Sequence, residues 1–252
     1  MNQATLLSNK TILITRPAGR EVYLRRLIEQ AAGHVIHYPV INILPPSAHE
    51  IEQLIHLREQ LQRFNMAIFI SATAVEQSRL YFPVLAEHLV IVSIGSKTTQ
   101  ALKQQNIHVD IEAPEHNTES LLKMAAFQMP QIQEQKILIF RGAGGRALLG
   151  DTLVERGADV RYVETYIRAI SPLPPLDESQ IQSLDAITVS SNEGLDNLIT
   201  LMQDPDLLIN IPLVVPSPRA HILARERGFR TVITAKNATD EAVFSALTGY
   251  LS

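Results

Sequence analysis

The chain contains no cysteine among its 252 residues, which excludes disulfide bonds, iron–sulfur clusters and zinc sites built from thiolates. It also contains no run of about 18 consecutive apolar residues, so the sequence predicts no membrane-spanning helix. Its start, MNQATLLSNKTILITRPAG, lacks a basic segment followed by a long apolar stretch, so we expect no signal peptide. These absences together favour a soluble protein of the reducing cytoplasm.

An excess of basic residues is also absent. The chain has 22 Lys and Arg against 26 Asp and Glu, a formal net charge of -4, which argues against nonspecific binding to nucleic acid. Apolar residues make up 46% of the chain and charged residues 19%, a balance typical of globular proteins. The length suits one large domain or two small ones.

Short apolar stretches alternate with segments of helical periodicity along the whole chain. This alternation is typical of α/β proteins with parallel sheets. The expected strands are 11–15, 35–38, 67–71, 90–94, 109–111, 137–140, 160–163, 186–189, 213–215 and 231–233.

The two halves of the chain resemble each other. TILITRPAG aligns with KILIFRGAG, IFISATAVEQ with TVSSNEGLDN, and IEAPEHNTESLL with ITAKNATDEAVF. The alignment pairs Ile12 with Ile137, Arg16 with Arg141, Gly33 with Gly157, Ser71 with Ser191, Ala74 with Gly194, Ala113 with Ala235 and Thr118 with Thr239. We therefore expect two similar domains.

Two stretches, 38–50 and 166–178, interrupt the α/β rhythm, and each contains a proline pair. Because proline removes a hydrogen-bond donor and stiffens the backbone, these stretches are interpreted as extended connectors rather than core strands. Two connectors imply that the chain crosses between domains twice. The expected domains are 1–38 with 171–252, and 50–165, with connectors at 39–49 and 166–170.

A glycine-rich loop follows the strand expected at 137–140. Gly142 to Ala147 fit the loose dinucleotide pattern G-x-G-x-x-[GA], and Glu164 stands where an acid would bind a ribose. However, the loop is a copy of RPAGRE, in which Pro17 replaces the first glycine. We interpret the glycines as permitting a tight turn and the close approach of an anionic ligand. Nucleotide binding remains the alternative.

Polar and basic side chains recur where strands end and helices begin. Ser71, Ala72 and Thr73, and later Ser191 and Asn192, open helices at such places, and the cations there are Arg16, Lys97, Arg141, Arg146 and Arg219. Ligands of open α/β sheets bind at these strand ends, where helix N-termini offer free N–H groups. A single serine or threonine there is more often a helix cap, so only the recurrence favours an anion site.

Several stretches, in their order and spacing, resemble the uroporphyrinogen-III synthase family. They are ILITRPAG, FISATAV, IGSKTTQAL, RGAGGRALLGDTLVERGADV, VETYIR, TVSSNEGL and NATDEAV, and they span nearly the whole chain. The resemblance implies two similar flavodoxin-like parallel-sheet domains joined by a two-stranded connector. It also implies an enzyme without cofactor or metal that cyclises hydroxymethylbilane, with inversion of the last pyrrole ring and loss of water.

The resemblance also implies the site residues. It makes Tyr166 the catalytic residue, assisting departure of the hydroxyl. The implied substrate-binding residues are Arg16, Ser71, Ala72, Thr98, Arg141, Gly142, Gly144, Ser191, Asn192 and Arg219. One loop departs from the family pattern, because VVPSPRAHIL places Pro216 at the expected glycine and Pro218 and Arg219 at the expected threonines.

The expected partners are few. The resemblance implies a polycarboxylate small-molecule substrate, a transient contact with hydroxymethylbilane synthase, and a monomer without nucleic-acid or membrane partners. The altered loop keeps an alternative open, in which the chain is a noncatalytic tetrapyrrole- or dinucleotide-binding module on the same fold.

Overall fold

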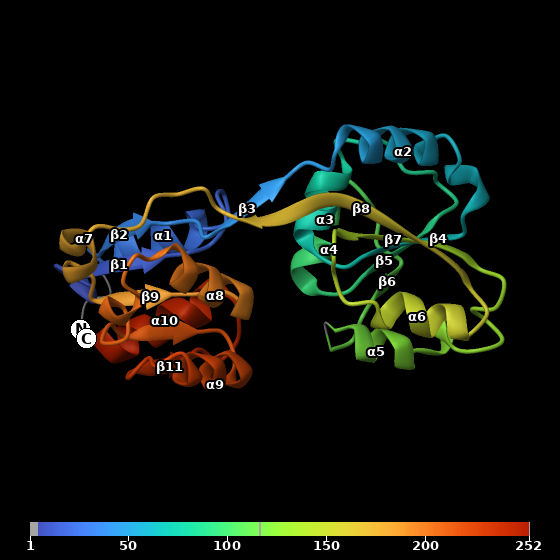
Figure 1. The fold of residues 1–252 in the computed structure, drawn as a ribbon. Helices are drawn as coiled ribbons and strands as arrows, with labels where there is room; N and C mark the ends of the chain where they lie inside the picture. Colours follow the sequence, from blue (N-terminus) through green and yellow to red (C-terminus); the bar gives the residue numbers. More distant parts are fainter. Residues whose placement is uncertain (1–4, 116, 252) are drawn as a thin grey trace. The chain divides into compact units, whose positions relative to one another are not determined.

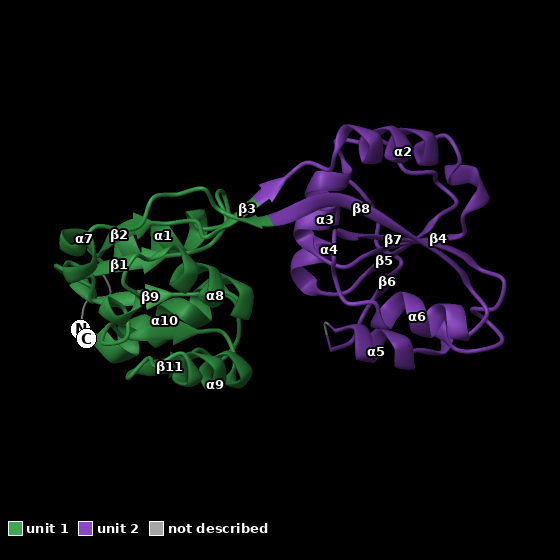
Figure 2. Cartoon of the chain, in the orientation of Figure 1, with its two compact units in different colours: residues 1–42, 169–252 green, residues 43–168 purple. Residues whose placement is uncertain are grey.

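A computed structural model describes residues 5–115 and 117–251 and divides the chain into two compact units (Figures 1 and 2). Unit 1 comprises Met1–Asn42 and Ala169–Ser252, and unit 2 comprises Ile43–Arg168. We propose that these units are the two domains expected from the sequence.

Unit 1 is built on a parallel sheet of five strands. The strands are β1 (Thr11–Ile14), β2 (His34–His37), β9 (Ala186–Thr188), β10 (Leu213–Val215) and β11 (Val232–Thr234). Their order in the sheet is β11-β10-β9-β1-β2. This is the flavodoxin-like arrangement, in which the strand order reverses between the first and third strands.

Helices cover the sheet of unit 1. They are α1 (Val22–Gln30), α7 (Glu178–Gln182), α8 (Asn192–Leu201), α9 (Pro218–Glu226) and α10 (Asp240–Leu251), with a 3₁₀ turn, η4 (Pro205–Leu207). Apolar side chains of α1 and α10 pack together on one face of the sheet, against Ile12 and Ile14 of β1. Right-handed crossovers place α8 and α9 on the opposite face.

Unit 2 has a sheet of six strands in the order β3-β8-β7-β4-β5-β6. The strands are β3 (Ile41–Leu44), β4 (Met66–Phe69), β5 (Val90–Ser93), β6 (Ile111–Glu112), β7 (Lys136–Gly142) and β8 (Asp159–Ile170). The strands from β8 to β6 are parallel, and β3 lies beside β8 at the edge.

The helices of unit 2 pack on both faces of its sheet. They are α2 (Ala48–Arg58), α3 (Ala72–Ser78), α4 (Ser96–Gln104), α5 (Thr118–Lys123) and α6 (Leu148–Glu155), with 3₁₀ turns η2 (Leu61–Arg63) and η3 (Ala125–Phe127). Side chains of α2, α3 and α4 form one cluster with alternate residues of β4 and β7. Side chains of α5 and α6 form the other cluster with the remaining residues of these strands.

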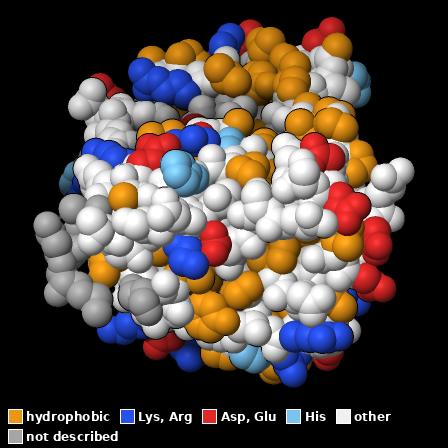
Figure 3. Space-filling model, turned by 90° about the vertical axis from the view of Figure 1, so that its left-hand side faces the viewer, with side chains coloured by type: hydrophobic (Ala, Val, Ile, Leu, Met, Phe, Trp, Pro, Cys, Tyr) orange, Lys and Arg blue, Asp and Glu red, His pale blue; other side chains and the backbone are white. Residues whose placement is uncertain are grey.

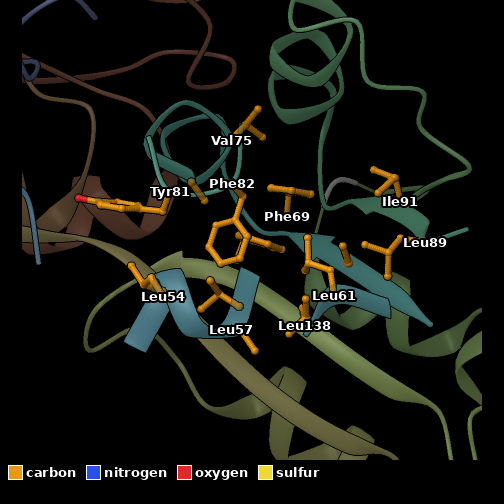
Figure 4. Close-up of a cluster of buried hydrophobic side chains, with 14 of the residues drawn as sticks. Leu54, Leu57, Leu61, Phe69, Val75, Tyr81, Phe82, Leu89, Ile91 and Leu138 are labelled. Atoms are coloured by element: carbon orange, nitrogen blue, oxygen red, sulfur yellow. The ribbon is translucent and has the colours of Figure 1, made fainter. Parts of the chain in front are cut away.

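Aromatic rings form the centre of the first cluster in unit 2 (Figure 4). Phe69 of β4 stacks on Phe140 of β7 with ring centroids 4.5 Å apart, and Phe82 meets Phe140 edge-on at 5.2 Å. Tyr166 of β8 belongs to the same cluster and is 4% exposed. The tyrosine is therefore held by a well-packed apolar core.

The expected internal repeat is confirmed by the sheet order. The series β2-β1-β9-β10-β11 in unit 1 corresponds to β8-β7-β4-β5-β6 in unit 2, so unit 2 begins with the third strand of the common pattern. Ile12 in unit 1 and Ile137 in unit 2 occupy equivalent positions in the pairing of their strands with the neighbouring strands. The fold class predicted from the sequence is confirmed.

Two of the expected residue pairings are wrong by one position. The left-handed backbone after α1 belongs to Ala32 (φ 62°), so Gly157 (φ 88°) corresponds to Ala32 and not to Gly33. Likewise Thr239 caps a helix at Ala242, as Asn117 caps one at Ser120, so Thr239 corresponds to Asn117 and not to Thr118. Each pair is identified by its shared backbone role.

The two extended connectors predicted from the sequence contain strands, in agreement with the two-stranded connector that the family resemblance implies. Ile41–Leu44 form β3, and β8 continues through Ile170, so parts of 39–49 and all of 166–170 are strand. The alternating apolar residues of 41–44 fit an edge strand, and Pro45 and Pro46 come directly after it and end it. Over the described residues, none of the helices is both long and apolar enough to cross a membrane.

Candidate functional site

In both units the strand order reverses between neighbouring strands, β1 and β9 in unit 1 and β7 and β4 in unit 2. Ligands of open α/β sheets bind beyond the carboxyl ends of the strands at this point. The residues predicted from the sequence as site residues stand at these strand ends in each unit.

In unit 2, a β-bulge brings Tyr166 against the end of β7. Arg141 is paired with Glu164, but the next residue, Gly142, is paired with Tyr166, so Thr165 is left without a partner in the ladder. The amide of Ala143 donates to the carbonyl of Tyr166 at 2.8 Å, which continues the pairing beyond the bulge. Such bulges redirect a side chain, and here the redirected side chain is the tyrosine.

The ring of Tyr166 lies directly on the backbone of Gly142. A Cβ atom at residue 142 would stand 2.7 Å from Cε2 and Cζ of the ring and 3.1 Å from the hydroxyl oxygen. Only glycine leaves room for this contact. The phenol oxygen is 3.4 Å from Oγ of Ser71, at the end of β4. Two hydroxyl groups therefore meet where β4 and β7 end, beside the middle of β8.

Ser71 has a second role as the first residue before α3. Its Oγ accepts a hydrogen bond from the amide of Ala74 at 3.0 Å, so it is the N-cap of that helix. The cap uses one lone pair of the oxygen and leaves the hydroxyl proton available for another acceptor. Ala72 opens the helix beside it, so the two residues predicted here stand together with Tyr166.

The three glycines after β7 serve different purposes. Gly144 has a left-handed backbone (φ 72°), and a Cβ atom there would meet nothing within 4 Å, so this position is a turn facing open space. At Gly142, the space that a side chain would fill is taken by the ring of Tyr166. A Cβ at Gly145 would stand 2.5 Å from Nη2 of Arg141. Two of the three glycines thus make room for side chains of the protein itself, and Gly144 leaves open space.

The cations at the first strand end of each unit are buried and paired. Arg16 is 8% exposed and forms an ion pair with Asp240 at the start of α10. Its carbonyl accepts a hydrogen bond from Nε2 of His37 at 2.8 Å. Arg141 is 4% exposed, and its Nε lies 3.5 Å from Oε1 of Glu164. Glu164, which the dinucleotide pattern would assign to ribose binding, is therefore paired with Arg141.

The arginine within the glycine-rich loop, Arg146, lies on the surface. Its Nη2 donates to Oε1 of Glu119 at 3.1 Å, with 74% of the arginine side chain exposed. Hydrogen bonds to Glu119, first from its own backbone amide and then from Arg146, lower the pKa of the Glu119 carboxyl. On the face drawn in Figure 3, Lys and Arg side chains are interspersed with Asp and Glu.

Thr98 follows the end of β5 and lies in the first turn of α4. It is 4% exposed, and its neighbour Thr99 donates from Oγ1 to Glu112 at 2.7 Å. The N-cap of α4 is Gly95, which provides no side-chain cap, and the amide of Thr98 donates to the Gly95 carbonyl at 2.8 Å. Lys97 is exposed at the same helix start.

Unit 1 repeats the capping arrangement. Oγ of Ser191 accepts from the amide of Gly194 at 3.0 Å, as Ser71 does in unit 2, and Asn192 opens α8. Ser217, which the sequence reasoning did not single out, caps α9 by accepting from Ala220 at 3.3 Å. Its signal was present, because a serine stands directly before a proline at the first helical position.

The structure corrects the expected alignment of the loop after β10. Val92 pairs with Ile111 as Val214 pairs with Ile233, so the two loops correspond with a constant offset. Arg219 is therefore the counterpart of Lys97 and not of a threonine. The residue at the position of Thr98 is Ala220, so the hydroxyl is indeed missing in unit 1. Arg219 is exposed at the start of α9.

Fold and strand-end geometry define an α/β protein made of two flavodoxin-like units. A family model described as uroporphyrinogen-III synthase HemD matches residues 23–245. The uroporphyrinogen-III synthase of Escherichia coli K12 is 31% identical over 259 residues, covering 94% of this chain and 99% of that protein. The Salmonella typhimurium LT2 protein of the same name is 30% identical, with the same coverage. The chain belongs to the uroporphyrinogen-III synthase family, whose members are cyclising lyases of tetrapyrrole biosynthesis.

Solved structures show the same fold. A mutant uroporphyrinogen III synthase from the extremely thermophilic bacterium Thermus thermophilus superposes with a TM-score of 0.62 at 16% identity, covering 96% of this chain and 97% of that one. The enzyme of Helicobacter pylori 26695 gives a TM-score of 0.60 at 14% identity, covering 95% and 99%.

Proposed function

We propose that this chain converts hydroxymethylbilane, a linear tetrapyrrole with eight carboxylates, into the cyclic type III uroporphyrinogen, with inversion of the last ring and loss of water. The observation that carries the proposal is similarity to named synthases along nearly the whole chain, at 31% identity in one case. The reaction needs positioning of a flexible polyanion and assistance to a departing hydroxyl, and both needs fit side chains at the strand ends.

Tyr166 is the proposed assistant to the departing hydroxyl. Its phenol oxygen is 3.4 Å from Oγ of Ser71, and Gly142 fixes the ring from the other side. A phenol is a weak acid, so it contributes a hydrogen bond or a proton without dominating the reaction. The bulge at Thr165 supports this role, because it turns the tyrosine toward the serine at a cost in regular pairing.

Backbone amides are the proposed main partners of the substrate carboxylates. In unit 2 these lie at the starts of α3 and α4 and along the glycine-rich loop, beside Ser71, Ala72, Thr98, Gly142 and Gly144. In unit 1 they lie at the starts of α8 and α9, beside Ser191, Asn192 and Arg219. Helix N-termini favour carboxylates through free N–H groups and the helix dipole. Arg16 and Arg141 are buried and paired, which weighs against direct contact of these two cations with the substrate carboxylates.

The cellular location, the oligomeric state and the protein partner are part of the same proposal. We place the enzyme in the cytoplasm, as a monomer that receives its unstable substrate through a transient contact with hydroxymethylbilane synthase. The absence of cysteine fits that compartment.

The role of Tyr166 is tested by the rate of type III isomer formation in single turnover. Tyr166→Phe should slow the reaction by ~10²–10⁴-fold at most while activity stays measurable, and product affinity should change little. Tyr81→Phe is the matched control, because Tyr81 is a buried tyrosine of the same apolar cluster, 8% exposed. Equal activities of the two variants would remove Tyr166 from the reaction and leave it a packing residue.

One observation favours a second candidate function, that of a noncatalytic binding module. Unit 1 has Ala220 where unit 2 has Thr98, so one hydroxyl of the paired loops is missing. A noncatalytic module that binds a tetrapyrrole or a dinucleotide would tolerate that loss. Binding of the type III product without any formation of it would favour this alternative.

A further inference from the structure

Arg141 stands at the centre of contacts that all come from its own unit. Its Nε donates to the carbonyl of Gly142 at 3.2 Å, and its Nη1 donates to the carbonyl of Arg146 at 3.3 Å. Its Nε is 3.5 Å from Oε1 of Glu164, and its guanidinium carbon lies 4.5 Å from the ring centroid of Tyr162. Only 5% of the side chain is exposed.

These contacts bridge the glycine-rich loop from one end to the other. Gly142 is the last residue of β7, and Arg146 lies two residues before α6 begins at Leu148. The ring of Tyr162, on which the guanidinium rests, also bonds the loop, since its hydroxyl donates to the carbonyl of Ala147 at 3.1 Å. A planar guanidinium with several fixed donors suits this task, which a lysine cannot perform.

The loop in turn is tied to the tyrosine. Gly142 lies under the ring of Tyr166, and the amide of Ala143 donates to the Tyr166 carbonyl at 2.8 Å. Any movement of the loop relative to β8 therefore moves the backbone that carries the phenol. The counterpart in unit 1, Arg16, is likewise buried and paired with an acid, Asp240.

We propose that Arg141 is a positioning residue, not a ligand for the substrate: it clamps the glycine-rich loop so that Gly142 and Ala143 hold Tyr166 in place. The proposal rests on the function proposed above for Tyr166. A cation that bound substrate carboxylates would show its loss chiefly in KM, whereas a clamp shows it chiefly in kcat.

Two variants disturb the clamp in different ways. Arg141→Lys keeps the charge and removes the fork of donors. Gly145→Ala keeps Arg141 itself, but the new Cβ would stand 2.5 Å from Nη2 and must push the guanidinium aside. The displaced atom is the end of a flexible side chain, so the fold tolerates the change. Arg161→Lys is the matched control, since Arg161 lies on the neighbouring strand β8, also against an aromatic ring, with its guanidinium carbon 5.9 Å from the ring centroid of Phe64.

Two readouts are needed, and one of them is independent of activity. In single-turnover and steady-state assays, both clamp variants should lose ~10–100-fold in kcat with KM within about threefold of the parent, because small misplacement of a reacting group is costly. In hydrogen exchange followed by NMR, the Ala143 amide should exchange at least ~10-fold faster in both, while the Ile139 amide in the middle of β7 and the control variant stay unchanged.

The contrary results are equally definite. A raised KM with unchanged kcat and a normally protected Ala143 amide would make Arg141 a substrate ligand. Unchanged exchange and activity in Gly145→Ala would show that the loop is held without the clamp, even if Arg141→Lys failed to fold. A parent protein that formed no type III isomer would remove the proposed function, yet the exchange rates would still decide whether Arg141 holds the loop.

Discussion

Gly142→Ala is the substitution for which the structure predicts the sharpest effect. Residue 142 is the last residue of β7 and does not have a left-handed backbone, so the main obstacle to alanine is its Cβ atom. That atom would stand 2.7 Å from two ring carbons of Tyr166. Because ordinary carbon contacts begin near ~3.5 Å, the ring must move by about 1 Å. Overpacking of this kind costs about 1–3 kcal/mol of stability.

The catalytic effect follows from the displaced phenol. A misplacement of about 1 Å in a reacting group costs roughly 10²-fold, so kcat for the type III isomer should fall by about that factor. The substitution acts through the hydroxyl, so it should add little to the defect of Tyr166→Phe in a double-mutant cycle. Single-turnover rates of the parent, the two single variants and the double variant give this coupling directly.

Two results would contradict the predicted effect of Gly142→Ala. A folded Gly142→Ala protein with parental kcat would show that the ring position does not matter for the reaction. Fully additive effects in the cycle would show that the alanine acts elsewhere, for example on a carboxylate bound along the loop. Thermal unfolding of each variant separates these outcomes from simple loss of fold.

Three further results are expected. The hydroxyl of Thr165 is buried without a hydrogen-bond partner, so Thr165→Val should raise stability by about 1–2 kcal/mol, seen as a higher Tm. Asp240→Asn breaks the buried pair with Arg16 and should cost about 3 kcal/mol in urea unfolding, and replacing both residues by apolar ones should cost less. Hydrogen bonds from the side chain and backbone of Ser47 lower the pKa of Glu50, so its stabilising contribution is complete above pH 4.5 and disappears as the pH falls. The Tm difference between the parent and Glu50→Gln, measured across pH, should therefore vanish in acid, and a constant difference would refute the assignment.

Much of the fold is readable from periodic patterns in the sequence. All ten expected strands are present, because short apolar stretches between helical segments specify a parallel sheet without reference to distant residues. The strand at 41–44 belongs to the two-stranded connector that the family resemblance implies, and its alternating apolar residues fit an edge strand. Pro45 and Pro46 act only on their own positions, where they end the strand.

The side-chain environment of the site is less predictable. The sequence places Arg16 and Arg141 at strand ends, where they resemble ligand-binding cations. Their burial depends on Asp240, far along the chain, and on Glu164 and Tyr162 of the neighbouring strand. No local pattern encodes those contacts.

The orientation of the tyrosine is the second feature that the sequence conceals. A perfect ladder would pair Thr165 with Gly142, and the bulge shifts this pairing by one residue to Tyr166. One slipped residue reverses which side chain faces a given side of a sheet. The contact between Gly142 and the tyrosine ring therefore follows from the register, which only the three-dimensional structure supplies.

The most direct test of the central claim is the isomer composition formed by the unaltered protein. Porphobilinogen and hydroxymethylbilane synthase supply the substrate in place, and the cyclic products are oxidised and separated by chromatography. We predict an excess of the type III isomer over type I that grows with the amount of this protein. Only the type I isomer, at every concentration of a correctly folded protein, would contradict the account.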